Sequence, residues 1–241
     1  MTALPNTRPR HENDHYITPA WATRALIQSG WLLGRPGDPR WGRRPVIWEP
    51  AVGTGAMAHV LAESGFAVIG SDLAAYEWPN GLDGQPYFDL ADFLEMEAAP
   101  AARGHRQLKC HVRDRKAGGM VLKAVPNLPA QISAIVTNPP WSDARAFAHH
   151  ALKLMAPVRG RVCLLLRMDF ESAAESRSLI AEHPAYAGRI ILGRRVSWFP
   201  GSEHKYSHPV CWYIWDFDLP EGTPQLTLYP EGEPLYDGDE R

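Results

Sequence analysis

The sequence has 241 residues, with 25 Lys and Arg against 27 Asp and Glu and a formal net charge of -2. Hydrophobic residues make up 45% of it, and nine Trp, eight Tyr and seven Phe exclude disorder throughout, so we expect one globular domain. No apolar run approaches the roughly 18 residues of a membrane span, and the N-terminus lacks a signal-peptide stretch, which predicts a cytoplasmic protein without a membrane partner. The odd number and wide spacing of Cys110, Cys163 and Cys211 favour reduced thiols and no metal site.

The charges are unevenly distributed along the chain. From Asp216 onward, eight carboxylates oppose only Arg241, so the rest of the chain is mildly basic. The stretch 98–130 contributes most of this excess, because it holds seven Lys and Arg against Asp114 alone. Such a distribution permits a nucleic-acid partner without requiring one.

A polar segment and an amphipathic helix open the chain. Residues 1–14 are aperiodic and contain prolines, so we expect a flexible arm. We expect a helix to begin at Thr18 and Pro19, because threonine is a good N-cap and proline is tolerated at the first helical position. The apolar face of this helix carries Trp21, Ala25 and Leu26. The stretch 34–45 is rich in glycine and proline, which predicts a loop there.

Short apolar runs alternate with helical patterns after this loop. Strands are expected at 46–48, 66–69, 132–136, 161–166, 189–192, 210–215 and 225–229, and helices at 143–155 and 171–182. Another helix follows the first strand and carries Met57, Val60 and Leu61 on one stripe. The alternation predicts an α/β fold, a Rossmann-like and mostly parallel twisted sheet with helices on both faces.

Three regions are expected from these patterns. The folded domain covers 15–217, the basic insertion 98–130 lies within it, and an acidic tail covers 218–241. The Gly118-Gly119 pair predicts a mobile loop in the insertion. In the late strand, the alternation of side chains predicts that Trp212 and Ile214 face one side of the sheet and Tyr213 and Trp215 the other.

The run EPAVGTG (49–55) lies between an expected strand and an expected helix. Gly53 and Gly55 let the backbone turn tightly and approach a ligand, whereas Glu49 is poorly suited to cradling phosphate. No GK[ST] ending of a phosphate loop is present. Two glycines alone are often only a turn.

Acidic residues follow the next two expected strands. Asp72 ends the second strand, where a carboxylate can accept two hydrogen bonds from a ribose diol. A third strand is expected near 87–88, and after it Asp92 offers an acceptor for an adenine amino group, with the ring of Phe93 beside it. An acid at a strand end is more often a cap, but the whole series favours a nucleoside cofactor. The missing phosphate features point to S-adenosylmethionine over NAD or ATP.

The run TNPPW (137–141) follows a buried strand. An exocyclic amine of a base is a poor nucleophile because its lone pair is delocalised into the ring. The side-chain oxygen of Asn138 and the carbonyl of Pro139 can accept hydrogen bonds from this amine, and Pro139 and Pro140 hold them rigid. Trp141 can stack on a base that has left the duplex. The alternative is a Pro-Pro turn with a surface tryptophan.

With DHYITPAW (14–21) ahead of WEPAVGTGAM, VIGSDL, DFL and TNPPW, the sequence resembles the amino-group DNA methyltransferases, which methylate adenine N6 or cytosine N4. It resembles in particular the small phage and prophage-type orphan adenine methyltransferases. The TP motif comes first, the cofactor loop next and NPPW after it, which is the gamma order of motifs in this family. The resemblance implies a class I S-adenosylmethionine-dependent methyltransferase domain. DNA, double- or single-stranded, is the implied partner.

The resemblance also implies roles for individual residues. Contacts to the methionine moiety fall to Thr18, Glu49 and the region of Ala51, with Gly53 and Gly55 in the cofactor loop. Contacts to the ribose fall to Asp72, and contacts to the adenine ring to Asp92 and Phe93. The target amine is held by Asn138, Pro139 and Trp141. With Pro140 these residues form the catalytic tetrad Asn-Pro-Pro-Trp (138–141).

Candidate nucleic-acid contacts lie outside these motifs. RRVSWFP (194–200) resembles a later motif of the family in which an aromatic residue packs against the flipped base, here Trp198 or Phe199, although either could be a core residue. In the insertion, Arg113, Arg115 and Lys116 could follow a phosphate backbone, and a solvated surface insertion explains them equally well. Tryptophan replaces the more frequent tyrosine or phenylalanine of the tetrad, and no separate target-recognition domain fits.

Three alternatives remain open on the sequence. An NPP-type methyltransferase could act on RNA or on a protein glutamine, because an amide nitrogen poses the same lone-pair problem. Cytosine N4 in DNA could replace adenine N6. A catalytically silent module could bind the cofactor or a nucleic acid without transferring a methyl group.

Overall fold

The computed structural model describes residues 16–33, 45–74, 76, 89–96, 109–114, 119–124, 132–193, 195–196, 198, 208–220 and 222–230, with backbone alone for 89–90, 109–114 and 119–124. The α-helices are α1 (Ala20–Gln28), α2 (Ala56–Glu63) and α3 (Ala144–Met155). Short 3-10 helices are η1 (Trp31–Leu33), η2 (Phe93–Glu95), η3 (Trp141–Asp143), η4 (Ala156–Val158), η5 (Met168–Ser172) and η6 (Ala174–Ser176). The strands are β1 (Val46–Glu49), β2 (Ala67–Asp72), β3 (Asp89–Leu90), β4 (Lys109–Asp114), β5 (Gly119–Ala124), β6 (Ala134–Thr137), β7 (Arg161–Arg167), β8 (Tyr186–Ile191), β9 (Val210–Asp216) and β10 (Leu226–Leu228).

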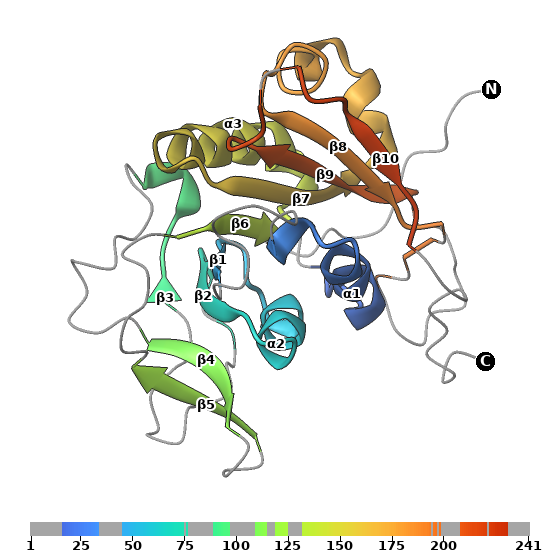
Figure 1. Cartoon of the computed structure of the whole chain (residues 1–241). Coiled ribbons are helices and arrows are strands. Elements are labelled where there is room, and N and C mark those ends of the chain that lie inside the picture. Colours follow the sequence, from blue (N-terminus) through green and yellow to red (C-terminus); the bar gives the residue numbers. More distant parts are fainter. Residues whose placement is uncertain are drawn as a thin grey trace, which may run out of the picture.

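One twisted sheet with parallel strands at its centre organises the molecule (Figure 1). Its order is β10-β8-β9-β7-β6-β1-β2-β4-β5, and β3 also pairs with β2. Strands β7, β6, β1 and β2 run parallel, and Trp48 of β1 aligns with Ile69 on one side and Ile135 on the other. Strand β9 is antiparallel to β7 and β8, and β4 is antiparallel to β2 and β5. The expected α/β fold is confirmed.

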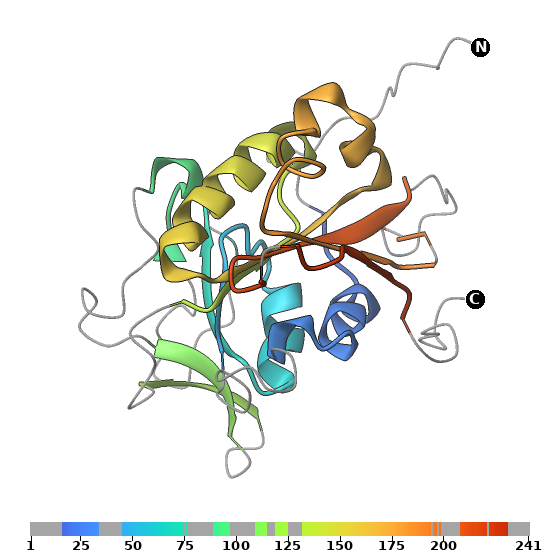
Figure 2. The ribbon, with the colours of Figure 1, turned by 45° about the horizontal axis from the view of Figure 1, so that its top comes forward.

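Helices cover both faces of this sheet (Figure 2). Helices α1 and α2 pack on one face, and α3 with the η5–η6 region packs on the other. Strand β9 is buried along its whole length and separates the two cores. Trp212 and Ile214 point into the core under α1, and Tyr213 and Trp215 into the core under α3, so the expected division of the four side chains is confirmed.

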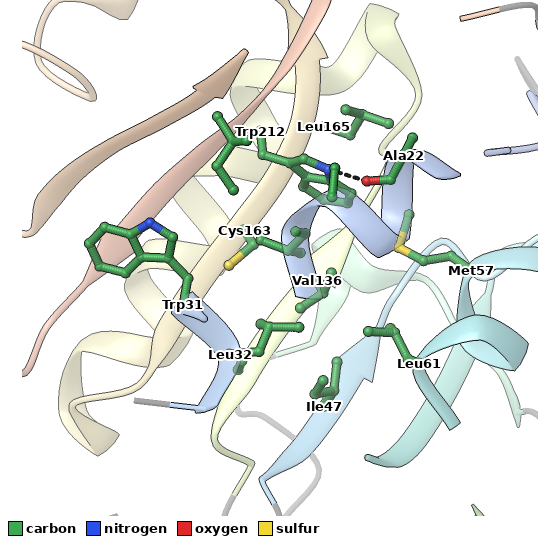
Figure 3. Packing of buried hydrophobic residues seen from close by; sticks show 14 of the residues in the cluster. Ala22, Trp31, Leu32, Ile47, Met57, Leu61, Val136, Cys163, Leu165 and Trp212 are labelled. Atoms are coloured by element: carbon green, nitrogen blue, oxygen red, sulfur yellow. Dashed lines mark hydrogen bonds between the residues drawn. The ribbon is translucent and has the colours of Figure 1, made fainter. Parts of the chain in front are cut away.

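The core under α1 fixes the position of that helix (Figure 3). The indole nitrogen of Trp212 donates a 2.8 Å hydrogen bond to the carbonyl oxygen of Ala22, which joins β9 to α1. Leu61 from α2 and Ile47 from β1 extend the same cluster, and both are fully buried. Burial of each such large side chain stabilises the fold by about 1.5–3 kcal/mol, so α1 is a firm support for the residues that precede it.

The expected helix over 171–182 is wrong. The chain forms the short η5 and η6 instead, and Ala173 between them is extended, with φ -72° and ψ 133°. Tertiary contacts explain the break. Glu171 pairs with Arg189 of β8, and the carbonyl oxygen of Leu179 accepts a 2.7 Å hydrogen bond from the Trp215 indole. These partners take the place of contacts along a helix.

The insertion and the C-terminal region extend the two edges of the sheet. Gly119 begins β5, the outer strand of a hairpin with β4, whereas Gly118, the other residue of the expected loop, lies outside the described residues. Strand β10 confirms the strand expected at 225–229, and it pairs in parallel with β8, so the sheet continues past residue 218. Along the described chain the longest helix has twelve residues, and none combines the length and apolarity needed to cross a membrane.

Candidate functional site

A cavity of about 570 Å³ opens at the carboxyl ends of β1, β2 and β6. Open α/β sheets commonly bind ligands at this edge, because the loops after parallel strands meet there. Most of the site residues expected from the sequence border it, namely Thr18, Glu49, Ala51, Gly53, Asp72, Asp92, Phe93, Asn138 and Pro140. Gly55, Pro139 and Trp141 are close to it in the chain but do not line it.

The glycine loop after β1 has the backbone geometry that its sequence predicts. Gly53 and Gly55 adopt positive φ angles of 51° and 86°, which residues with a Cβ atom rarely adopt. Gly55 is the N-cap of α2, so the turn directs the chain into this helix. The backbone amide of Val52 donates to the carbonyl oxygen of Ser71 at 3.0 Å, which ties the loop to β2.

Asp72 ends β2 and is nearly buried. Its Oδ2 accepts a 2.8 Å hydrogen bond from the amide of Gly53, and its Oδ1 accepts a 3.0 Å bond from the amide of Ala74. A carboxylate has about four acceptor positions, so Asp72 can still accept hydrogen bonds from a ligand in the cavity. The indole of Trp48 donates to the hydroxyl of Ser71 at 2.9 Å and stabilises the same strand ends.

Glu49 is a buried acid on the cavity wall. It is 2% exposed, and its Oε2 is buried without a hydrogen-bond partner among the residues that the structure describes. Burial, with a smaller contribution from the charge of Asp72, raises its pKa well above the ordinary glutamate value. A buried carboxyl group of this kind can accept a hydrogen bond from a ligand or pair with a positive charge on it.

Asp92 and Phe93, which follow β3, also line the cavity. Oδ1 of Asp92 accepts a 2.9 Å hydrogen bond from the amide of Leu94 and caps η2. Phe93 borders the cavity, yet it is only 2% exposed, and its ring centroid lies 5.3 Å from that of Trp48 and 4.8 Å from that of Phe147. Phe93 is therefore part of the core as well as of the wall.

Two exposed leucines on the cavity wall were not expected. Leu73 is 64% exposed and Leu94 is 39% exposed, and both border the cavity. Each follows an expected ligand contact in the chain, since Leu73 comes after Asp72 and Leu94 after Phe93. The runs SDL and DFL contain them, but only their exposure distinguishes them from core leucines.

Asn138 joins the loop after β6 to the segment that precedes α1. Its Nδ2 donates to the hydroxyl of Thr18 at 3.2 Å and makes a longer contact of 3.5 Å with the carbonyl oxygen of Tyr16. Its Oδ1 is buried and has no hydrogen-bond partner within the described parts of the chain. Thr18 was expected as the N-cap of α1, and this is wrong: Pro19 holds that position, and the Thr18 hydroxyl accepts from Asn138.

Three aromatic rings pack together beside Asn138. Tyr16 and Trp141 are stacked, with centroids 5.3 Å apart and planes at 27°. Trp198 lies 5.4 Å from Trp141 and 5.6 Å from Tyr16, and it is 7% exposed. Of these rings only Tyr16 borders the cavity. Tyr16 stands in the DHYITPAW run but had been given no role, and it covers the tryptophan that was expected to stack on the base.

The side chains of Arg167 and His208 also lie near Trp141. The guanidinium carbon of Arg167 lies 6.0 Å from the Trp141 ring centroid, and the ring of His208 lies 6.1 Å from it. Partial burial lowers the pKa of His208, and the positive charges of Arg167 and Arg195 act in the same direction. Arg167 was assigned no role from the sequence, because it follows no motif, and His208 was interpreted as part of a polar loop without a specific function.

The remaining candidate nucleic-acid contacts are not brought to the cavity by the described structure. Arg113 lies in β4, one strand beyond β2, where the backbone alone is described. Arg115, Lys116 and Phe199 lie outside the described residues, as does the segment 87–88 where a strand was expected.

No protein-family model and no curated protein matches this sequence. Solved structures resemble it in fold. The methyltransferase subunit of a type I restriction-modification system from Streptococcus thermophilus is 15% identical, with a TM-score of 0.50 over 83% of this chain and 44% of that chain. A protein from Listeria monocytogenes assigned to the class I S-adenosylmethionine-dependent methyltransferases is 10% identical, with a TM-score of 0.52 over 91% of this chain and 67% of that chain. The chain thus has a class I methyltransferase fold and spans less than half the length of the S. thermophilus subunit.

Proposed function

From this fold and its cavity, we propose that the protein transfers a methyl group from S-adenosylmethionine to the exocyclic amine of a base in DNA, namely adenine N6. One observation carries the proposal. The buried and unpartnered Oδ1 of Asn138 belongs to a residue that borders the same cavity as Glu49 and Asp72. An acceptor for an amine and acceptors for a nucleoside therefore meet at one site.

The residues of the cavity fit S-adenosylmethionine. The volume of the cavity, about 570 Å³, lies within the usual range of small-molecule sites. Asp72 can accept hydrogen bonds from a ribose diol, and the unpartnered Oε2 of Glu49 suits a positively charged amino group. Leu73 and Leu94 offer exposed apolar surface to an adenine ring, next to the acceptor Asp92. When bound, the cofactor supplies an electrophilic methyl group on a positively charged sulfur.

Asn138 supplies the chemistry that the amine requires. The lone pair of an exocyclic amine is delocalised into the ring, and the nitrogen becomes nucleophilic when acceptors draw its hydrogens out of the ring plane. Oδ1 of Asn138 is one such acceptor, and we assign the second role to the carbonyl of Pro139, which is buried and follows Asn138 in the chain but does not line the cavity. Acceptors that are already in place stabilise the positive charge that develops on the nitrogen, and loss of one group of this kind commonly lowers kcat by about 10²–10³-fold.

The aromatic rings favour a base as the substrate. A base in a duplex has to leave the stack before it reaches a pocket, and an aromatic side chain then replaces part of the lost stacking. Tyr16 borders the cavity and supplies such a ring, with Trp141 stacked on it and Trp198 packed against both. A structural neighbour that serves a restriction-modification system favours DNA as the polymer.

Labelled cofactor tests the proposal. The protein is incubated with S-adenosylmethionine that carries a labelled methyl group and, separately, with duplex DNA, single-stranded DNA, RNA and a protein mixture. We expect label in DNA, recovered after digestion as N6-methyldeoxyadenosine. Recovery as N4-methyldeoxycytidine would correct the target base, and label confined to RNA or to glutamine would overturn the DNA assignment. Cofactor binding without transfer to any polymer would instead identify a silent binding module.

A further inference from the structure

We propose that Thr18 is a positioning residue whose hydroxyl holds the Asn138 amide with its nitrogen turned away from the target amine. Oδ1 of Asn138 is thereby kept available as the acceptor for that amine. The catalytic consequence rests on the proposed function, whereas the contact between the two side chains does not. This role differs from the methionine contact that the family resemblance implies for Thr18.

The partners of the amide determine its orientation. Nδ2 lies 3.2 Å from Oγ1 of Thr18 and 3.5 Å from the carbonyl oxygen of Tyr16. A hydroxyl could also donate, but a carbonyl oxygen only accepts, so the NH₂ group has to face this pair. A flipped amide would oppose its oxygen to the Tyr16 carbonyl and would present N–H groups to the hydrogens of the target amine. The flipped state therefore has no acceptor for the reaction.

The segment that holds the amide is itself firmly supported. Thr18 is 6% exposed and directly precedes the N-cap of α1, which makes no side-chain capping bond. The Thr18 hydroxyl is thus not used to cap the helix. Helix α1 is fixed to the sheet through its buried face and through the bond from Trp212 to Ala22. Asn138 and Thr18 are 120 residues apart in the chain, so it is the tertiary fold that brings them together.

Substitutions of threonine separate this role from a cofactor contact. Thr18→Val removes the acceptor with little change in shape, and Thr18→Ser retains it. Thr23→Val is the matched control, because Thr23 is a fully buried threonine of α1 whose hydroxyl has no partner among the described residues. We expect Thr18→Val to lower kcat roughly tenfold at saturating cofactor, with the Kd for S-adenosylmethionine changed less than twofold. Thr18→Ser should recover most of kcat, and Thr23→Val should keep it.

A spectroscopic readout does not depend on turnover. The side-chain NH₂ resonances of Asn138 in a ¹⁵N-labelled sample are assigned by their loss in Asn138→Asp. We expect them to shift in Thr18→Val and to stay in place in Thr23→Val. Unchanged resonances, or a weaker cofactor Kd with kcat preserved, would overturn the proposal. If the wild-type protein methylated no nucleic acid, the proposed function would fail, while the amide resonances would still decide whether Thr18 holds Asn138.

Discussion

The amide of Gly53 donates a 2.8 Å hydrogen bond to Oδ2 of Asp72, and this bond joins the loop after β1 to the end of β2. Because Oδ1 accepts from Ala74, each oxygen of the carboxylate already stabilises a turn. Asp72 therefore shapes the cavity in addition to offering acceptors to a ligand. Its substitution is expected to affect both stability and cofactor binding.

We expect Asp72→Asn to weaken the binding of S-adenosylmethionine at least tenfold and to lower Tm. An asparagine side chain presents an NH₂ group to one of the two backbone amides, so a donor faces a donor. A buried mismatch of this kind costs about 1–3 kcal/mol, and each kcal/mol is worth roughly 2–4 °C in a chain of this length. Calorimetric titration and thermal unfolding measure the two effects. Glu63→Gln, on the exposed end of α2, is the control, and an unchanged Kd in Asp72→Asn would contradict the assignment.

The raised pKa of Glu49 predicts a pH-dependent stability. Because the folded chain holds this proton more tightly than the unfolded chain, the free energy of unfolding falls as the pH rises from the ordinary glutamate pKa of about 4.3 through the raised value. Glu49→Gln remains neutral and lacks this decline. At neutral pH and without cofactor, we expect the variant to be more stable by about 1 kcal/mol, or roughly 2–4 °C in Tm.

The same substitution should have the opposite effect on ligand binding. A neutral amide cannot pair with a positive charge on the cofactor, so Glu49→Gln should bind S-adenosylmethionine more weakly although it is more stable. Thermal unfolding at several pH values, each with and without cofactor, separates the two effects. If the Tm difference between Glu49→Gln and the wild type, both without cofactor, stayed constant from pH 4 to pH 8, Glu49 would not be the titrating group.

Tyr16 is expected to contribute to binding of the base, because it borders the cavity and stacks on Trp141. Stacking of a base on an aromatic ring is worth about 1–3 kcal/mol. We therefore expect Tyr16→Ala to raise the KM for DNA by about tenfold or more, and Tyr16→Phe to retain most of the affinity. Steady-state kinetics with a defined oligonucleotide measure the change. Equal KM values for Tyr16→Ala and the wild type would exclude this role.

Gly188 permits the close approach of β10 to β8. Its φ is 137°, and a Cβ at this position would lie 1.9 Å from the carbonyl oxygen of Leu226. We expect Gly188→Ala to destabilise the protein by about 2 kcal/mol or more. Gly193 also has a positive φ, of 73°, but a Cβ there meets nothing within 4 Å, so Gly193→Ala should cost only about 1–2 kcal/mol of backbone strain.

Chemical denaturation of the two glycine variants compares these costs. Hydrogen exchange of residues 226–228 provides a local readout, because the pairing of β10 with β8 should be lost first in Gly188→Ala. Equal stabilities would mean that β10 does not pack against Gly188.

Much of the fold follows from local sequence. Parallel strands buried on both faces read as short apolar runs, and the strands around Ile47, Ile135 and Leu164 were located by this pattern. The glycine loop and the Asn-Pro-Pro turn were found because each motif lies directly after such a strand. The carboxyl ends of parallel strands meet at one edge, so the order of the motifs also predicts that Glu49 and Asn138 share a cavity.

Other features depend on contacts between distant parts of the chain. The run over 171–182 has a helical composition, yet the partners of Glu171 and Leu179 lie on β8 and β9. The threonine before α1 matches an N-cap, but its hydroxyl bonds to a residue 120 positions away. The exposure of Leu73 is likewise set by the shape of the cavity mouth. Local propensity cannot encode any of these three features.

The measurement that tests the central claim most directly is methyl transfer to DNA by Asn138→Ala, with the Kd for S-adenosylmethionine determined on the same sample. We predict a loss of transfer of about 10²-fold or more, with the Kd changed less than threefold, because the lost oxygen serves the amine and not the cofactor. Transfer at the wild-type rate, with the cofactor still bound, would contradict the account.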